Sequence, residues 1–201
     1  MDVVFLLECH DSTVIDDAWN STLHFVDDAV SRIHPRSGGT HVALALISHQ
    51  TTTVIRKLDD QPLYAVHNMS KTCPGQGRDI SSSLTTMKRS VFNNREGDRP
   101  EVPDILVLIV GEAGDDGVET AASLKAEGIR IVTVAMATNE QTLHQLRRLA
   151  SSDVDAQRLV VARAEQYRII LPTLVDVLCR TTDSGQLFIG DSLRTLSVMT
   201  M

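Results

Sequence analysis

Residues 105–117 read ILVLIVGEAGDDG, a continuous apolar run followed by a glycine-rich turn. A run of Val, Ile and Leu without polar alternation is typical of a parallel strand whose two faces are both covered by helices. Comparable runs occur at VVFLLE (3–8), VALALIS (42–48) and IRIVTVAMA (129–137). Between these runs, apolar residues recur at helical spacing. The pattern therefore predicts strands that alternate with helices.

The α/β class follows from this alternation, because parallel strands are joined by right-handed helical crossovers. TTTVIRKL (51–58) follows VALALIS (42–48) after a couple of polar residues. This hairpin spacing predicts an antiparallel edge strand. RLVVA (158–162) is a short further strand. We expect a three-layer sandwich with a mostly parallel six-stranded sheet, one antiparallel edge strand and helices on both faces. The domain is expected over residues 1–180, with 181–201 as a linker or tail.

The composition and charge of the chain exclude several classes of protein. The chain has 201 residues, of which 42% are hydrophobic, and a formal net charge of −7. The apolar fraction excludes a disordered chain, no apolar run is long enough for a membrane span, and no basic cluster suits nucleic acid or a membrane surface. The opening MDVVFLLE lacks the basic region and cleavage site of a signal peptide. We expect a cytosolic protein or one domain of a longer chain, and the strand at the very start favours the longer chain.

Three loops carry the candidate chemistry, because α/β sheets bind ligands at the carboxyl ends of their strands. They are ECHDST (8–13), CPGQGRDISSS (73–83) and GEAGDDG (111–117). The third loop matches neither the dinucleotide fingerprint nor a P-loop, and its two Asp residues would repel phosphate. Cys9 and His10 are adjacent at a strand end, where neighbouring side chains point in opposite directions and do not form a nucleophile–base pair. These loops predict no enzyme and no cofactor, with a cytosolic nucleotide-binding protein or enzyme kept as an alternative.

The order and spacing of these segments resemble the von Willebrand factor type A domain, also called the integrin I domain. The likeness covers roughly residues 2–180 and is carried by DVVFLLECHDST (2–13), GGTHVALALIS (38–48) and GQGRDISSSLTTMKRSVFNNREGDRPEVPDILVLIV (75–110). The last segment is most similar to extracellular members such as those of type VI collagen and matrilins. The resemblance implies a secreted, non-enzymatic module of the extracellular matrix that occurs in tandem arrays and binds other matrix or cell-surface proteins.

The family's hallmark is a metal-ion-dependent adhesion site, built from an Asp and two Ser of the first loop, a Thr of the second and an Asp of the third. Carried onto this sequence, those positions are Glu8, His10, Ser12, Arg78 and Gly111. Ser12 alone keeps the family residue. A histidine nitrogen suits magnesium poorly, and a permanently charged guanidinium repels a divalent cation. The resemblance therefore implies a degenerate site that holds no metal, and partner binding that needs no cation.

One alternative keeps a weak Mg²⁺ or Mn²⁺ site. A shift of one residue in the alignment brings Asp79 to the second-loop position or Glu112 to the third. Either carboxylate would then join Glu8 and Ser12 around the cation. Asp79 also suits the N-cap of the helix that follows it. Arg78 either presents a fixed positive charge or is an ordinary solvated residue of the loop.

The resemblance also places Cys9 and Cys73 on neighbouring loops, where a disulfide is possible in a secreted protein if their Cα atoms come close enough. Three buried reduced thiols are an equal alternative. If Cys9 and Cys73 form a disulfide, Cys179, near the end of the last helix, is the odd cysteine. Asn20 and Asn68 begin two sequons, which are possible glycosylation sites in a secreted protein.

Overall fold

The computed structural model describes residues 1–8, 17–33, 39–47, 52–59, 79–93, 97–111, 114, 117–135, 140–157 and 167–179. Its strands are β1 (Asp2–Glu8), β2 (His41–Ile47), β3 (Thr52–Asp59), β4 (Asp104–Val110) and β5 (Arg130–Ala135). They form one sheet in the order β3-β2-β1-β4-β5. All neighbouring pairs are parallel except β2 with β3, which is antiparallel. The predicted mostly parallel sheet with an antiparallel edge strand is therefore confirmed.

The expected number of strands was wrong: the sheet of the described residues has five strands, not six. The sixth expected strand, 158–162, lies outside those residues, as does the expected tail, 181–201. That expectation rested on a single short apolar run, and such a run does not by itself distinguish a strand from other buried structure. The four longer runs are all strands of the sheet.

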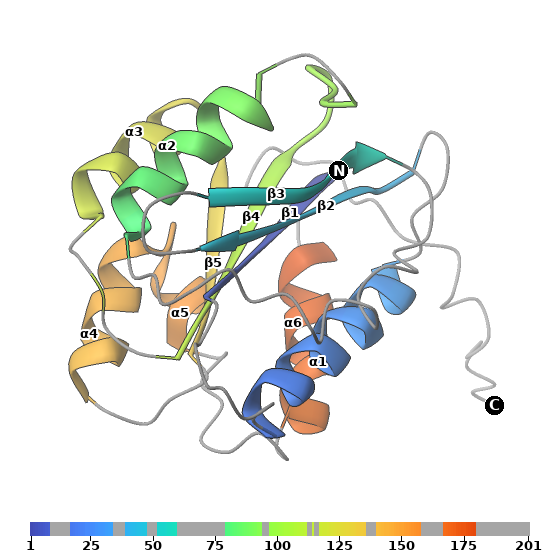
Figure 1. Ribbon diagram of the computed structural model, residues 1–201, viewed down its shortest axis with the longest axis vertical. Helices are drawn as coiled ribbons and strands as arrows, with labels where there is room; N and C mark the ends of the chain where they lie inside the picture. Colours follow the sequence, from blue (N-terminus) through green and yellow to red (C-terminus); the bar gives the residue numbers. More distant parts are fainter. Residues whose placement is uncertain are drawn as a thin grey trace, which may run out of the picture.

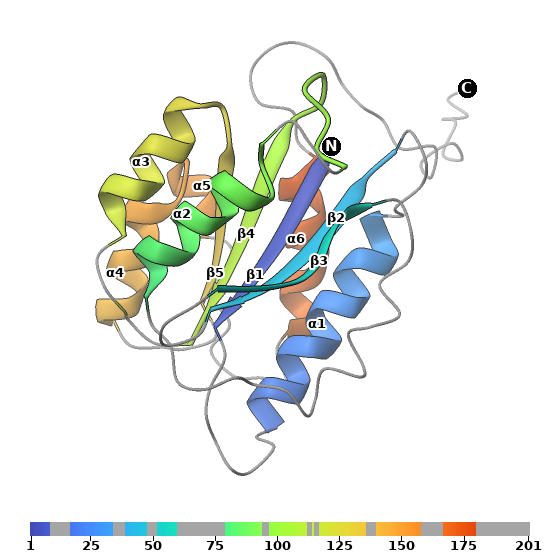
Figure 2. The same ribbon diagram turned by 45° about the horizontal axis from the view of Figure 1, so that its top comes forward.

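Helices cover both faces of the sheet, giving three layers (Figures 1 and 2). They are α1 (Asp17–Ile33), α2 (Ile80–Ser90), α3 (Val118–Ala126), α4 (Glu140–Leu149), α5 (Asp153–Gln157) and α6 (Tyr167–Cys179). Helices α1 and α6 pack together on one face, while α2, α3 and α4 cover the other. None of the described helices is long and apolar enough to cross a membrane.

The apolar runs follow from this layering. Along β1, Phe5 and Leu7 contribute to the core beneath α1 and α6, whereas Val4 and Leu6 contribute to the core beneath α2, α3 and α4. All four side chains are fully buried. Because a strand covered on both faces has no solvent side, it needs no polar alternation. The continuous runs in the sequence are therefore the direct signature of the three-layer sandwich.

The segment before β4 folds back on the edge hairpin. Its turn contains Gly97, whose φ of +102° favours glycine, and a Cβ there would lie 1.9 Å from the backbone oxygen of Leu58. The carbonyl oxygen of Gly97 lies 2.8 Å from Nδ1 of His41 at the start of β2. This close approach brings the following residues, Asp98 and Arg99, to the amino ends of β1 and β4.

Candidate functional site

The first and third predicted loops begin where the parallel strands β1 and β4 end. Glu8 is the last residue of β1, and Gly111 follows β4. The register pairs Leu7 with Ile109, so the two strands end side by side. Asp79 lies directly before α2, on the same side of the sheet as α3. The carboxyl edge of the sheet is therefore the candidate site.

Glu8 reaches from β1 to the third loop. Its side chain is only 8% exposed, and its Oε2 accepts a hydrogen bond of 2.6 Å from the backbone N–H of Gly111. A carboxylate that accepts from a backbone amide makes a charge-assisted bond, stronger than one between neutral groups. The structure thus joins two of the positions that the sequence assigned to the adhesion site.

Asp79 caps helix α2, as predicted. Its Oδ1 accepts a 2.8 Å hydrogen bond from the backbone N–H of Ser82. Its carbonyl oxygen accepts from both the N–H and the hydroxyl of Ser83, at 3.1 and 2.8 Å. The hydroxyl of Thr52 on β3 donates to Ser83 Oγ at 2.8 Å. These contacts fix the start of α2 against the edge strand and occupy one oxygen of the Asp79 carboxylate.

Gln145 of α4 is a residue of this edge that the sequence analysis missed. Its side chain is 8% exposed, and its Oε1 accepts a 3.1 Å hydrogen bond from the N–H of Gly114. A signal for Gln145 was present in the sequence, because Thr142 and Gln145 share the helical spacing of the buried Leu146.

Gly117, the N-cap of α3, has a φ of +55°, and a Cβ there would lie 3.0 Å from the side chain of Ile80.

Several predicted residues fall outside the described part of the chain: Cys9, His10, Ser12, Asn68, Cys73, Arg78 and Glu112. Asn20 lies within α1, but its side chain is not among those described. Cys179, at the end of α6, is exposed and forms no disulfide among the described residues. Desolvation and the nearby carboxylate of Asp176 raise the pKa of its thiol, which lowers its reactivity.

A second acidic group lies at the opposite edge of the sheet. Carboxylate oxygens of Asp2, Asp98 and Asp104 lie within 4.8 Å of one another. Carboxylates are ligands that hard divalent cations take, but Arg99 already engages both oxygens of Asp2. The group therefore has the character of an internal ion-pair cluster, and it lies away from the candidate adhesion loops.

Burial and like charge perturb one member of that cluster. Desolvation, the carboxylates of Asp98 and Asp2, and a hydrogen bond with Asp98 raise the pKa of Asp104 from its ordinary 3.8 to about 7. Buried carboxyls that face each other cannot all ionise, so one of them holds a proton. Near neutral pH, Asp104 is consequently present in both its protonated and its ionised form.

The described residues at the carboxyl edge offer a bound carboxylate, a helix cap and backbone amides. That arrangement can hold loops in place and present them to a partner. Among these residues no nucleophile lies beside a general base, which is the pairing that covalent catalysis needs.

Comparisons with known proteins agree with this geometry. The family model of the von Willebrand factor type A domain matches residues 2–173. Human collagen alpha-6(VI) chain is 26% identical over 185 residues, which are 88% of this chain and 7% of that protein. Rat von Willebrand factor is 24% identical over 119 residues, 58% of this chain and 27% of that protein. The chain thus spans a small part of the length of these relatives.

Solved structures share the fold. A structure of proximal thread matrix protein 1 from the mussel byssus, with a zinc-occupied MIDAS motif, superposes with a TM-score of 0.71 at 21% identity. The match covers 89% of this chain and 45% of that one. None of these relatives supports the alternative of a cytosolic nucleotide-binding protein or enzyme. This chain belongs to the von Willebrand factor type A domain family.

Proposed function

We propose that the chain is a non-enzymatic protein-interaction module of the extracellular matrix, and that it binds its partners without a divalent cation. The collagen VI chain and the byssus matrix protein among its relatives support the location and the class of partner. The small share of those proteins that it spans supports one domain, over residues 1–180, within a multi-domain chain, with 181–201 as a linker or tail. Its proposed contacts lie in the loops at the carboxyl edge of the sheet, at His10, Arg78, Asp79 and Glu112, with the buried Glu8 holding the third loop in place.

The hydrogen bond from Gly111 to Glu8 is the observation that supports cation independence. A magnesium ion needs hard oxygen ligands that point into one octahedral shell. Here one oxygen of Glu8 is already bound by a backbone N–H, whose positive end would repel a cation. Gly111 also supplies no carboxylate where the family has an aspartate. The longer glutamate side chain thus bridges β1 and β4 without a metal.

A thermal melt tests this proposal directly. We expect the same melting temperature in EDTA and in millimolar Mg²⁺ or Mn²⁺, because the proposed folded state has no set of ligands that would bind the cation. A cation at about 100 times its dissociation constant would stabilise the fold by about 2.7 kcal/mol, a shift of several degrees. Binding to purified matrix proteins, measured in parallel, should be insensitive to EDTA. Either a cation-dependent melt or EDTA-sensitive binding contradicts the proposal.

Shortening Glu8 tests its bridging role. Glu8→Asp should lose the hydrogen bond to Gly111 and destabilise the domain by about 1 kcal/mol in EDTA, since a buried acceptor and a backbone donor are both left poorly satisfied. Urea unfolding measures the change. Glu101→Asp, an exposed glutamate in the turn before β4, is the matched control and should change stability by less than about 0.5 kcal/mol. Equal stability of the two variants would show that the hydrogen bond between Glu8 and Gly111 does not stabilise the domain.

A weak metal site is the second candidate, favoured by the zinc-occupied MIDAS motif of the byssus protein structure. It would use Glu8 and Ser12 with Asp79 or Glu112. Zn²⁺ therefore belongs in the melt series beside Mg²⁺ and Mn²⁺. The double variant Arg78→Thr with Gly111→Asp restores the family residues at two positions. On this candidate we expect a cation-dependent melt of the original sequence and a larger cation-dependent shift in the double variant. No cation-dependent shift in the double variant would show that the loops are misaligned.

A further inference from the structure

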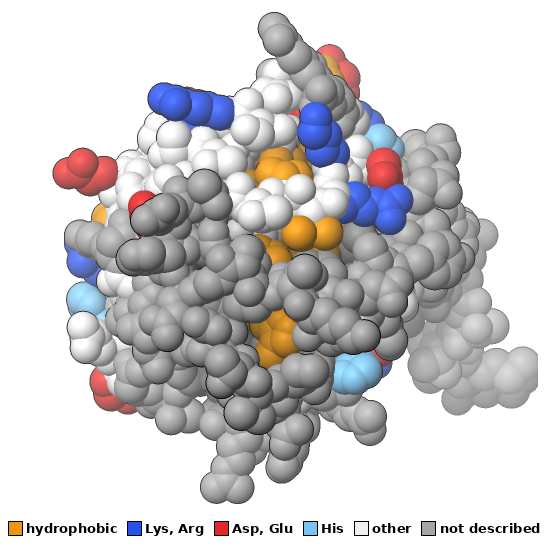
Figure 3. Space-filling view, in the orientation of Figure 1, with side chains coloured by type: hydrophobic (Ala, Val, Ile, Leu, Met, Phe, Trp, Pro, Cys, Tyr) orange, Lys and Arg blue, Asp and Glu red, His pale blue; other side chains and the backbone are white. Residues whose placement is uncertain are grey.

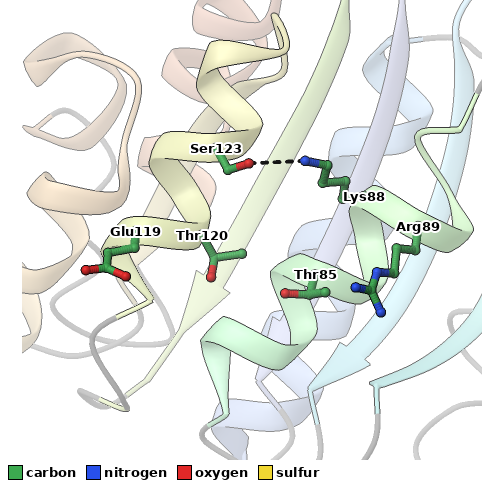
Figure 4. Close-up of a pocket in the computed structure, with 6 residues that line it drawn as sticks. All are labelled: Thr85, Lys88, Arg89, Glu119, Thr120 and Ser123. Carbon is green, nitrogen blue, oxygen red and sulfur yellow. Dashed lines mark hydrogen bonds between the residues drawn. The ribbon is translucent and has the colours of Figure 1, made fainter.

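A pocket of about 320 Å³ lies between α2 and α3, outside the candidate adhesion site (Figure 4). Its six lining side chains are Thr85, Lys88 and Arg89 of α2 and Glu119, Thr120 and Ser123 of α3. All six are polar or charged. The pocket therefore offers hydrogen-bonding and charged groups to a polar ligand.

Cross-helix bonds fix the walls of the pocket. The hydroxyls of Ser81 and Thr120 share a hydrogen bond of 2.9 Å near the start of both helices. Farther along, Lys88 Nζ donates to Ser123 Oγ at 3.1 Å and forms an ion pair with Glu127. The two helices are therefore tied together on either side of Thr85, and the pocket exists before a ligand arrives. A preformed pocket lowers the entropic cost of binding.

The donors of this pocket suit a carboxylate. Arg89 is exposed and forms no side-chain hydrogen bond or ion pair with the described residues, so its fork of N–H groups is available. Lys88 uses two donors on Ser123 and Glu127 and keeps a third. The Ser123 oxygen accepts from Lys88, which leaves its own hydrogen to donate. In contrast, Glu119 places one negative charge on the lining.

Few large hydrophobic side chains are exposed among the described residues. On the face in Figure 3, the hydrophobic side chains that can be seen form separate areas. Among the described residues, Ile55 is the single large hydrophobic side chain that is well exposed, at 37%. Lys88 is paired with Glu127, so Arg89 is the cation of the pocket that is available to an acidic ligand.

We propose that the α2–α3 pocket binds an acidic side chain from a peptide segment of a protein partner. Arg89 makes the principal contact, and Lys88 and Ser123 orient the second oxygen of the carboxylate. Glu119 weakens the contact, because it places a negative charge on the lining. Because both cations are solvent-accessible, added salt weakens the binding. This contact is additional to the adhesion loops of the proposed function.

The test is an NMR titration of the whole chain with a hexaglutamate peptide at low salt. We expect amide shifts concentrated at residues 85–89 and 119–123. Arg89→Ala should weaken binding by about fivefold or more, and Glu119→Gln should tighten it by about twofold. Arg147→Ala is the matched control, because Arg147 is also an exposed arginine in the last turn of a helix, α4. It should change the affinity by less than about twofold.

Equal weakening by Arg89→Ala and Arg147→Ala would show a general charge effect and overturn the proposal that the peptide binds in the pocket. Amide shifts confined to other elements would overturn it as well. Binding of a sulfated oligosaccharide without binding of hexaglutamate would overturn the assigned partner class. The outcome is separate from that of the proposed function. If the peptide binds here but the domain binds no matrix protein, the pocket stands and the proposed function fails.

Discussion

Replacing Arg99 by Ala should destabilise the domain by about 3–5 kcal/mol, the usual cost when one partner of a buried ion pair is removed. The side chain of Asp2 is fully buried, and Arg99 meets it with three donors. Nε and Nη2 donate to Asp2 Oδ1 at 2.9 and 2.5 Å, and the backbone N–H donates to Oδ2 at 2.8 Å. Without the guanidinium, the buried carboxylate would keep the backbone N–H of residue 99 but lose the positive charge beside it.

Arg99 also connects three separate segments. Its Nη2 donates to the carbonyl oxygen of Met1 at 3.0 Å and to that of Gly39 at 2.6 Å. The first carbonyl precedes β1, and the second lies just before β2. Alanine would leave both without this donor. The planar fork of arginine suits such a junction, whereas the single ammonium of lysine does not reproduce it.

Urea unfolding at pH 7 measures the Arg99→Ala effect. A double variant, Asp2→Asn with Arg99→Ala, removes the unpaired charge together with its partner and should be more stable than Arg99→Ala alone. Arg147→Ala controls for loss of an exposed arginine and should stay within about 0.5 kcal/mol of the original. A loss below about 1 kcal/mol for Arg99→Ala, or no recovery in the double variant, would mean that Asp2 does not depend on Arg99.

The strands could be predicted from sequence because one physical cause produces their pattern. A strand buried on both faces is apolar throughout, and β1, β2, β4 and β5 all have that environment. The edge strand β3 was predicted from its hairpin spacing instead, and its mostly half-exposed side chains explain its mixed composition. The run at 158–162, the basis for a sixth strand, lies outside the described residues, whose sheet has five strands.

The sequence predicted which residues lie at the candidate site, but not the contacts between them. Glu8 and Gly111 could be assigned to one edge because parallel strands end together. Their hydrogen bond depends on side-chain length and loop path, which the sequence pattern does not encode. The buried Gln145 was missed for a related reason, since its partner, the N–H of Gly114, lies 31 residues away along the chain. Asp79 was predictable as a cap because capping is local.

The acidic cluster shows the same limit at the amino edge. Asp2 begins β1 and Asp104 begins β4, so sheet order brings them to one edge. Asp98 joins them only because the turn at Gly97 folds back toward Leu58. Such a return path is a tertiary feature. Like charges that meet in this way create a pH dependence that composition alone does not reveal.

Asp104→Asn should therefore stabilise the domain near pH 8, by about 2 kcal/mol after allowance for solvent screening of a half-buried group. The folded-state pKa of Asp104 is about 7, above the ordinary 3.8 that applies when the chain unfolds. Between these values the folded state holds one more proton than the unfolded state. Stability from this group is thus fully present below about pH 4 and is lost as the pH rises to about 7.

The amide that Asp104→Asn introduces cannot ionise and can donate to Asp98 at every pH, as the protonated carboxyl does only below neutrality. Urea unfolding at pH 5 and pH 8 should give Asp104→Asn a clear advantage at pH 8 and a much smaller one at pH 5. The exposed Asp28 of α1 supplies the control, since Asp28→Asn should show no such difference. Arg99 and Asp2 are retained in both variants, so the ion pair at this edge is unchanged. An advantage of equal size at the two pH values would show that the pKa of Asp104 is not raised in the folded state.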